Sequence, residues 1–416
     1  MWTHPPGPWR RRLTLAALVP LAAASILAAP RPDPEKLRAR YARYVALGDH
    51  LGFSLCGDST VFMIVAEHPG MLLTPGFLYQ SRPLVFATAH AVGRAATVVV
   101  PEEALRLAPL PGWWSPYLVL NAIVLVASIW LFDAAVAPPG ARYPVTALLA
   151  ALLLVNEVVR WFLCSPHTQL LIVLAPVLCL VLARSTLAAP GVMTQRRALV
   201  LGGTIGLLVL AYGAFLVCVP VVVIASMLRP ATRRSGVTTA LALFVVAATT
   251  PTLAWYAFVQ IASGSVYSGE VAKYRQFVWP ADAAASGRLL ATASAFAREF
   301  AVTSASVLWI PLAILGSAVA VGWTQLRPAG LPPERRIEAC AAVLTLACQT
   351  SFLYWLGFYR VRLSIGMVPP ILALANVVLA SAWPSLPTRT RRSVVAVLAL
   401  VVAASVVHVL VEDPPA

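Results

Sequence analysis

The residues of this chain that could do chemistry are concentrated in one polar stretch, residues 49–83. Asp58 precedes an apolar run with helical spacing. It is therefore either a helix N-cap or a carboxylate able to take a proton from an acceptor hydroxyl. Arg82 precedes Pro83 at the start of the next hydrophobic run, where it either anchors a helix end to lipid headgroups or binds a phosphate. The stretch thus offers a base and a phosphate-binding cation, each with a structural alternative.

A second group of polar residues lies inside and just beyond a hydrophobic segment. Glu157 and Arg160 are three residues apart, so on a helix they share a face and can pair. An ionised group near mid-membrane costs about 2.5–3.5 kcal/mol, so such residues face a partner or a cavity. His167 follows in Ser165-Pro166-His167, as an interfacial histidine or as part of a site that includes the pair.

Two further groups of positive residues lie between hydrophobic segments later in the chain. Tyr274 and Arg275 belong to a stretch of aromatic and basic residues, which is typical of an interfacial belt and also suits contact with a lipid phosphate. Arg360 and Arg362 lie between two predicted spans. Guanidinium groups make paired hydrogen bonds to phosphate oxygens, so this pair is the best candidate for holding a phosphate.

The composition predicts which kind of protein positions these residues. The chain has 416 residues, of which 60% are hydrophobic and 11% charged, against roughly a quarter charged in a soluble domain. We therefore expect residues 1–416 to form one transmembrane domain in a lipid bilayer. The net charge of +15 comes from short arginine clusters between hydrophobic segments. Because positive-inside topology explains such clusters, nucleic acid is not an expected partner.

The hydrophobic segments predict an all-α fold, a polytopic transmembrane helical bundle of roughly 10–12 spans. Leu84–Val100 is short and contains Arg94, so it either spans or lies along the interface. Ala198–Leu228 is too long for one upright helix, which leaves a hairpin of two short helices or one kinked helix. The candidate segments are Leu13–Ala29, Leu84–Val100, Leu118–Ala137, Pro144–Leu163, Leu170–Leu182, Ala198–Leu228, Val237–Ile261, Phe300–Trp323, Ala339–Phe358, Leu363–Trp383 and Ser393–Leu410.

The arginine clusters also predict topology. If they are all cytoplasmic, residues 31–117 and 262–299 form two long outer loop regions of a multi-pass protein of the cell membrane. The candidate residues then gather on the extracytoplasmic face. Leu37, Tyr41, Tyr44 and Val45 recur at helical spacing, which predicts that the first outer loop carries short interfacial helices.

The six cysteines show no CxxC spacing, so the sequence indicates no cysteine-based metal or redox motif. Cys56 and Cys164 both fall in predicted outer segments, where a disulfide can form if the two residues approach each other. The sequence leaves that pairing open.

Four short motifs together resemble a known group of enzymes. They are Gly57-Asp58-Ser59-Thr60-Val61-Phe62, Ser81-Arg82-Pro83-Leu84, Ser165-Pro166-His167 and Tyr354-Trp355-Leu356-Gly357-Phe358-Tyr359-Arg360-Val361-Arg362. In type and order they resemble the GT-C superfamily of polytopic membrane glycosyltransferases. Those enzymes take a sugar from a polyprenyl-phosphate carrier and work on the extracytoplasmic side.

The resemblance implies roles for particular residues. Asp58 matches the carboxylate of the first outer loop that acts as general base, while Arg82, Arg360 and Arg362 match positions that face the carrier phosphate. We therefore expect hexosyl or pentosyl transfer from a lipid-phosphate-linked sugar donor. The sequence lacks an Asp-x-Asp or Asp-Glu pair near Asp58, so it contains no clear metal motif and leaves a divalent cation open.

Two alternative functions belong to other classes. A transporter or flippase of a lipid-linked saccharide requires charged residues along a path through the bilayer, for which Asp133 and Glu157 are the candidates. A non-catalytic membrane scaffold would leave Arg360 and Arg362 on the outer face without a role. The position of the charged side chains in the folded protein distinguishes these functions.

Overall fold

The protein is an all-α polytopic bundle, as the sequence predicts. The computed structural model describes residues 8–29, 31–39, 42–136, 144–191, 193–229, 237–326, 330–357 and 361–411. The side chains of Glu157 and Tyr274 lie outside the described part, as do all atoms of Arg360. In the described residues, seven helices are long and apolar enough to cross a membrane. The chain is therefore a multi-pass membrane protein.

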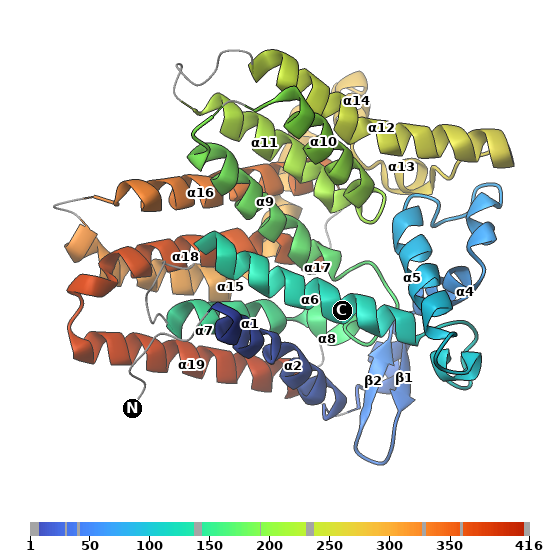
Figure 1. Ribbon diagram of the computed structural model, residues 1–416, viewed down its shortest axis with the longest axis horizontal. Coiled ribbons are helices and arrows are strands. Elements are labelled where there is room, and N and C mark those ends of the chain that lie inside the picture. The colour runs from blue at the N-terminus through green and yellow to red at the C-terminus, as the bar shows by residue number, and fades with distance from the viewer. Residues whose placement is uncertain are drawn as a thin grey trace.

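The long helices lie side by side and run along the long axis of Figure 1. Of the seven, α18 and α9 contain the largest buried shares and form the centre, whereas α12 and α19 are mostly at the periphery. Asn376 of α18 ties this centre together, because its amide donates to the Val136 carbonyl and accepts from Thr146. The helices are α6 (Ser115–Val136), α9 (Leu171–Ala188), α12 (Val237–Ser263), α15 (Leu289–Leu326), α16 (Pro333–Leu356), α18 (Val368–Ala382), which follows η5 (Ile365–Met367) and leads into η6 (Trp383–Ser385), and α19 (Thr388–Val411).

Three predicted segments are divided into shorter helices. The first is α1 (Pro8–Ala16) and α2 (Leu18–Leu27), and Pro144–Leu163 is α7 (Pro144–Leu154) and α8 (Glu157–Phe162). Asn156 causes the second division, because its side chain caps α8 by accepting from the Val159 amide. The long segment Ala198–Leu228 adopts the hairpin form, with α10 (Gln195–Val209), a turn, then η3 (Gly213–Val217) and α11 (Cys218–Met227).

The α10 arm of that hairpin packs closely on α12. A Cβ atom at Gly202 would lie 2.4 Å from the Phe244 carbonyl oxygen, and one at Gly206 would lie 2.5 Å from that of Ala248. Glycines four residues apart let two helix backbones approach in this way. The packing places the turn after α10 beside α5 (Pro83–Ala96), whose Leu84 amide donates to the Leu210 carbonyl.

Residues 31–117, the predicted first outer loop region, differ from the sequence prediction in one respect. The region does contain helices, namely α3 (Pro34–Ala39), α4 (Ser59–Glu67), η1 (Pro69–Leu73), α5 and η2 (Glu102–Leu105). Tyr44 and Val45, predicted to be helical, instead lie in β1 (Arg43–Ala46), which pairs antiparallel with β2 (Gly52–Leu55). The helical spacing fails because Tyr44 and Val45 pair with Ser54 and Phe53 across the hairpin. At 14 residues, α5 is too short to span.

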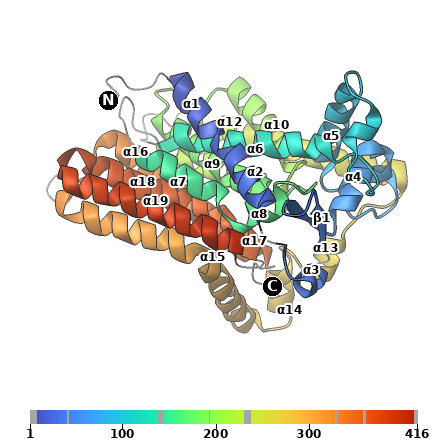
Figure 2. The same cartoon turned by 90° about the horizontal axis from the view of Figure 1, so that it is seen from below.

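The second outer loop region also forms short helices, α13 (Gly269–Tyr274) and α14 (Trp279–Ala285). The first turns of α15 project from the bundle together with α14 (Figure 2). Trp279 joins this region to the end of α16, because its indole donates to the Trp355 carbonyl at 3.0 Å. Gly357 then ends α16 in the left-handed conformation, with φ 67°, where a Cβ atom would lie 2.4 Å from the Trp279 ring.

One end of the bundle carries arginines that pair with buried or partly buried carboxylates. At this end, Arg184 near the end of α9 pairs with Glu338 of α16 at 3.1 Å and donates to the Ala134 carbonyl of α6. At the same end, Arg11 of α1 pairs with Asp133 of α6 at 2.6 Å. We call it the basic end. The opposite end, here the site end, carries α4, α5 and the β hairpin on the right of Figure 1.

Candidate functional site

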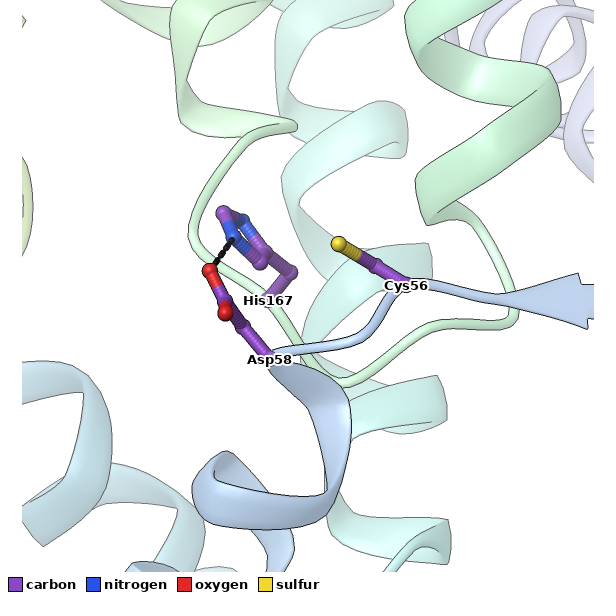
Figure 3. A group of neighbouring side chains, drawn as sticks. All are labelled: Cys56, Asp58 and His167. Atoms are coloured by element: carbon purple, nitrogen blue, oxygen red, sulfur yellow. Dashed lines mark ion pairs between the residues drawn. The ribbon is translucent and has the colours of Figure 1, made fainter. Parts of the chain in front are cut away.

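Asp58 lies at the site end, immediately before α4, and it does not cap that helix through its side chain. Its backbone is helical, with φ −72° and ψ −17°, and among the described residues its carboxylate makes no capping hydrogen bond. The carboxylate instead faces His167, with 3.8 Å between Asp58 Oδ2 and His167 Nε2 (Figure 3). The side chain is 54% exposed, so the capping alternative fails and the carboxylate remains accessible.

His167 is held rigidly beside this carboxylate. Its ring lies between Phe62 and Phe162, with centroid distances of 4.9 and 4.8 Å, and its side chain is 3% exposed. The backbone amide of Gln169 donates to His167 Nδ1 at 3.0 Å. Because Nδ1 is an acceptor, the proton of the neutral ring is on Nε2 and points toward Asp58.

The electrostatics of the pair follow from that geometry. Burial lowers the pKa of His167 to about 4, so the ring is neutral at physiological pH. The His167 ring, more than any other neighbour, holds the pKa of Asp58 below its usual value, and Tyr79 and Arg362 lower it further. Asp58 is therefore an ionised carboxylate at neutral pH.

The loop that carries His167 is irregular and wholly buried, so its backbone needs internal partners. Asn121 of α6 supplies them, because its amide donates to the carbonyls of Phe162, Leu163 and Ser165 at 2.9–3.1 Å. The Trp114 indole donates to the carbonyl of Cys164, which lies between Leu163 and Ser165. Through these bonds α6 and the segment before it hold the His167 loop in place against α4.

Arg82 joins the same neighbourhood from the start of α5. Its guanidinium donates to the Thr168 hydroxyl at 3.0 Å and lies 5.8 Å from the centre of the Tyr212 ring. Tyr212 is fixed in turn, because its hydroxyl accepts from Gln169. Arg82 also contributes to the lowered pKa of His167. The arginine therefore stands beside the His167 loop with part of its guanidinium held in place.

Arg362 comes from a distant part of the sequence, on α17 (Val361–Ser364). Its charge helps to lower the pKa values of Asp58 and His167 and opposes the rise in pKa that burial causes at Cys56, which places the charge near all three. Ser364 holds this one-turn helix to α15 through a 3.1 Å contact with Ser304. Among the described residues, none forms a direct hydrogen bond or ion pair with the Arg362 guanidinium. Its charge is available to a ligand.

Two other predicted site residues, Arg160 and Arg275, have their described contacts away from Asp58. Arg160 is buried in α8 and lines a cavity of about 20 Å³ beside the β hairpin, together with Tyr44 and Ser54. Arg275 forms a two-point ion pair with Asp282, at 2.5 and 2.6 Å. The side chains of Glu157 and Tyr274, and Arg360 altogether, lie outside the described residues, so their predicted roles stay predictions.

Cys56, Asp58 and His167 offer three ligand atoms within 4.8 Å of one another, which is close enough for a metal ion. The chemistry of the donors does not fit one. A ligating histidine donates its second ring N–H to a neighbour, but His167 Nδ1 accepts one.

The sequence leaves open a disulfide between Cys56 and Cys164. Cys56 and Cys164 are both free thiols in the described part of the chain, so the disulfide left open by the sequence does not form. Their backbones are nonetheless close, because the Cys56 amide donates to the Ser165 hydroxyl at 3.3 Å. That bond joins the end of β2 to the His167 loop without a covalent link.

Sequence reasoning missed two members of this site. Tyr79 lies beside Asp58. Its burial and, to a smaller extent, the Asp58 charge raise the pKa of the Tyr79 hydroxyl, so the hydroxyl stays protonated and acts as a donor. Its spacing of three residues from Arg82 is a weak signal for a shared face. Tyr212 carries no sequence signal beyond its place in the hairpin turn. Only the packing of that turn against α5 brings it to Arg82.

No family model matches this chain, and no curated protein or solved structure matches it either. The function must therefore be argued from the site itself.

Proposed function

We propose that this protein is an integral membrane glycosyltransferase that moves a sugar from a polyprenyl-phosphate carrier to an acceptor hydroxyl. One observation carries the proposal: an ionised, half-exposed carboxylate, Asp58, lies within the electrostatic reach of Arg362 and beside the Arg82 neighbourhood. A base and cations at one membrane face are what transfer from a lipid phosphate needs. The resemblance to the GT-C superfamily in the sequence motifs supports the same reaction.

In this reaction Asp58 accepts the proton of the acceptor hydroxyl while the hydroxyl oxygen forms a bond to the sugar carbon. The bond between that carbon and the phosphate oxygen breaks, and the carrier phosphate leaves with the electron pair. Arg82 and Arg362 stabilise the negative charge that develops on the leaving phosphate. His167 is buried and acts as a positioning residue, keeping Asp58 ionised and oriented.

An apolar groove supports a lipid-linked donor. It has a volume of about 610 Å³, lies between α15 and α19, and is lined from Trp309 to Val321 along α15. Trp309 lies five residues beyond Ser304, or about 7.5 Å along a helix, and Ser304 contacts the short helix that carries Arg362. A prenyl chain in this groove would bring its phosphate toward Arg362.

We place the site end on the extracytoplasmic side, because the arginine-rich helix ends gather at the opposite end. Two exposed residues test this orientation. In intact cells, a membrane-impermeant maleimide should label a cysteine at position 50 (His50→Cys) and should not label one at position 388 (Thr388→Cys), against a background in which the native cysteines are replaced by alanine. Labelling at position 388 alone would invert the orientation and remove the extracytoplasmic site.

The transporter alternative has less support. Its candidate Asp133 pairs with Arg11 at 2.6 Å at the basic end, so that carboxylate balances a helix-end arginine. Its second candidate, Glu157, has no described side chain. The described charges therefore gather at the two ends and do not mark a path between them.

The proposal is tested by Asp58→Asn, which removes the base and keeps the side-chain size. We expect transfer of labelled sugar from polyprenyl-phosphate donors to fall by roughly 10²- to 10⁴-fold, the usual contribution of a general base. Asp49→Asn, an exposed turn residue of the same loop region, is the matched control and should transfer normally. Full transfer by Asp58→Asn at equal protein level would remove the assigned base.

A further inference from the structure

The basic end contains a second cavity that the proposed reaction does not use. Its volume is about 560 Å³, and it lies between the end of α9, the loop that follows and the first turns of α10. The end of α11 closes one side through Arg229.

The mouth of this cavity is positively charged. Arg196 and Arg197 are exposed on the first turn of α10. Arg229 is buried, and it holds the loop in shape by donating to the carbonyls of Ala189 and Gly191 at 3.0 and 2.6 Å. None of the described lining residues is acidic. The cavity therefore favours an anion.

Below the arginines the cavity becomes apolar. Val200 and Leu201 line it one turn further along α10, and Thr204 lies eight residues after Arg196, or about 12 Å along the helix axis. Val200 is 64% exposed, so this part of the cavity is open to its surroundings. The Thr204 hydroxyl is satisfied by the Val200 carbonyl. Charge at the surface above an apolar channel matches an amphiphile with an anionic head.

We propose that this cavity binds an anionic phospholipid, with its phosphate between Arg196 and Arg197 and one acyl chain along Val200 and Thr204. Guanidinium groups bind phosphate oxygens through paired hydrogen bonds. Positive-inside topology explains the sign of the charge at this end, but it does not explain a cavity that continues beneath the charge. The proposal goes beyond the reaction at Asp58 and stands without it.

The test uses the full-length protein in detergent, incubated with equal amounts of dioleoyl phosphatidylglycerol and dioleoyl phosphatidylcholine. Native mass spectrometry then measures the ratio of the two bound lipids. We expect phosphatidylglycerol to be preferred by roughly 30-fold, since each arginine near the membrane surface contributes about fivefold. Arg196→Gln/Arg197→Gln should remove most of this preference.

The matched control is Arg389→Gln/Arg392→Gln, which removes two exposed arginines from the start of α19. It should keep the preference, because these residues do not line the cavity. A second variant, Val200→Trp, fills the apolar part and leaves the charges in place. It should lower the number of phosphatidylglycerol molecules bound, and it keeps the test informative if the double glutamine variant fails to fold.

Three results would overturn the proposal. Equal loss of preference in the α19 control would mean a general attraction to the basic end. An unchanged preference in Arg196→Gln/Arg197→Gln, together with an unchanged number of bound phosphatidylglycerol molecules in Val200→Trp, would mean that the lipid binds elsewhere. Displacement of bound phosphatidylglycerol by millimolar inorganic phosphate, with no lipid preference remaining, would mean that the cavity recognises free phosphate and not a lipid.

Discussion

The two ends of the bundle use arginine in different ways. At the basic end, Arg184 and Arg335 surround the buried Glu338, and Arg11 pairs with Asp133. At the site end, Arg362 has no direct hydrogen bond or ion pair with any described residue, although it lies near an accessible carboxylate.

The difference separates arginines that are paired within the fold from one that has no direct partner among the described residues. A buried ion pair keeps both partners committed, and removing one strongly destabilises the fold. A cation near the surface without a direct partner contributes little to stability, so its presence at a polar site favours a role in binding a ligand. The same distinction applies between Arg275, which is paired with Asp282, and Arg362, which has no such partner among the described residues.

The largest expected effect is loss of transfer when both site arginines are replaced. For Arg82→Gln/Arg362→Gln we expect a fall of at least about 10³-fold, since each donor to a developing anion contributes roughly 10²- to 10³-fold. The measurement is sugar transfer per folded protein in proteoliposomes. Arg275→Gln is the matched control, and a comparable fall there would break the distinction between committed and available arginines.

The next effect is on stability at the basic end. Glu338→Gln leaves Arg184 and Arg335 near an uncharged partner, and we expect the free energy of unfolding to fall by about 3–5 kcal/mol. Transfer per folded molecule should remain normal. Glu334→Gln, exposed on the same helix, should change stability by less than about 1 kcal/mol. An undiminished melting temperature for Glu338→Gln would show that the buried pair is not structural.

A smaller effect concerns pH and His167. Its pKa is about 4 in the folded protein and 6.5 in the unfolded chain, so on acidification the unfolded chain takes up the proton first. Stability is therefore full above pH 6.5 and falls as the pH approaches 4, by up to about 3 kcal/mol. Asp58 contributes only at lower pH, because its unfolded value is 3.8.

His167→Asn removes this titrating group. We expect thermal unfolding between pH 7 and 4.5 to depend less on pH in the variant than in the wild type. His68→Asn replaces an exposed histidine and should leave the pH dependence unchanged. The same slope in the wild type and in His167→Asn would mean that the buried ring does not stay neutral.

The sequence predicted the helical bundle well because hydrophobic length reports directly on membrane spans. It predicted the β hairpin of β1 and β2 less well. Tyr44 and Val45 fit a helical period as readily as a strand, and only their pairing with Ser54 and Phe53 decides between them. Asn156 lies inside the predicted span Pro144–Leu163. Its capping of α8 depends on the local backbone, which hydrophobic length does not predict.

The site was predicted in part for a similar reason. Asp58, Arg82, His167 and Arg362 stand out as polar residues in an apolar chain, and folding brings them to one end. Asn121 was not predicted, because a single asparagine in a long span carries no sign that it will hold the His167 loop. The Arg275–Asp282 pair forms across a turn in which Arg275 and Phe277 have left-handed backbone, a conformation that the residue types do not indicate.

The most direct test of the account separates binding from chemistry at the site end. Binding of polyprenyl phosphate to Asp58→Asn, Arg362→Gln and wild-type protein in nanodiscs is measured beside transfer by the same preparations. The account predicts that Asp58→Asn binds the carrier as tightly as the wild type and fails to transfer, while Arg362→Gln binds it weakly. Normal carrier binding and full transfer by Arg362→Gln would contradict the claim that this arginine is held for a phosphate.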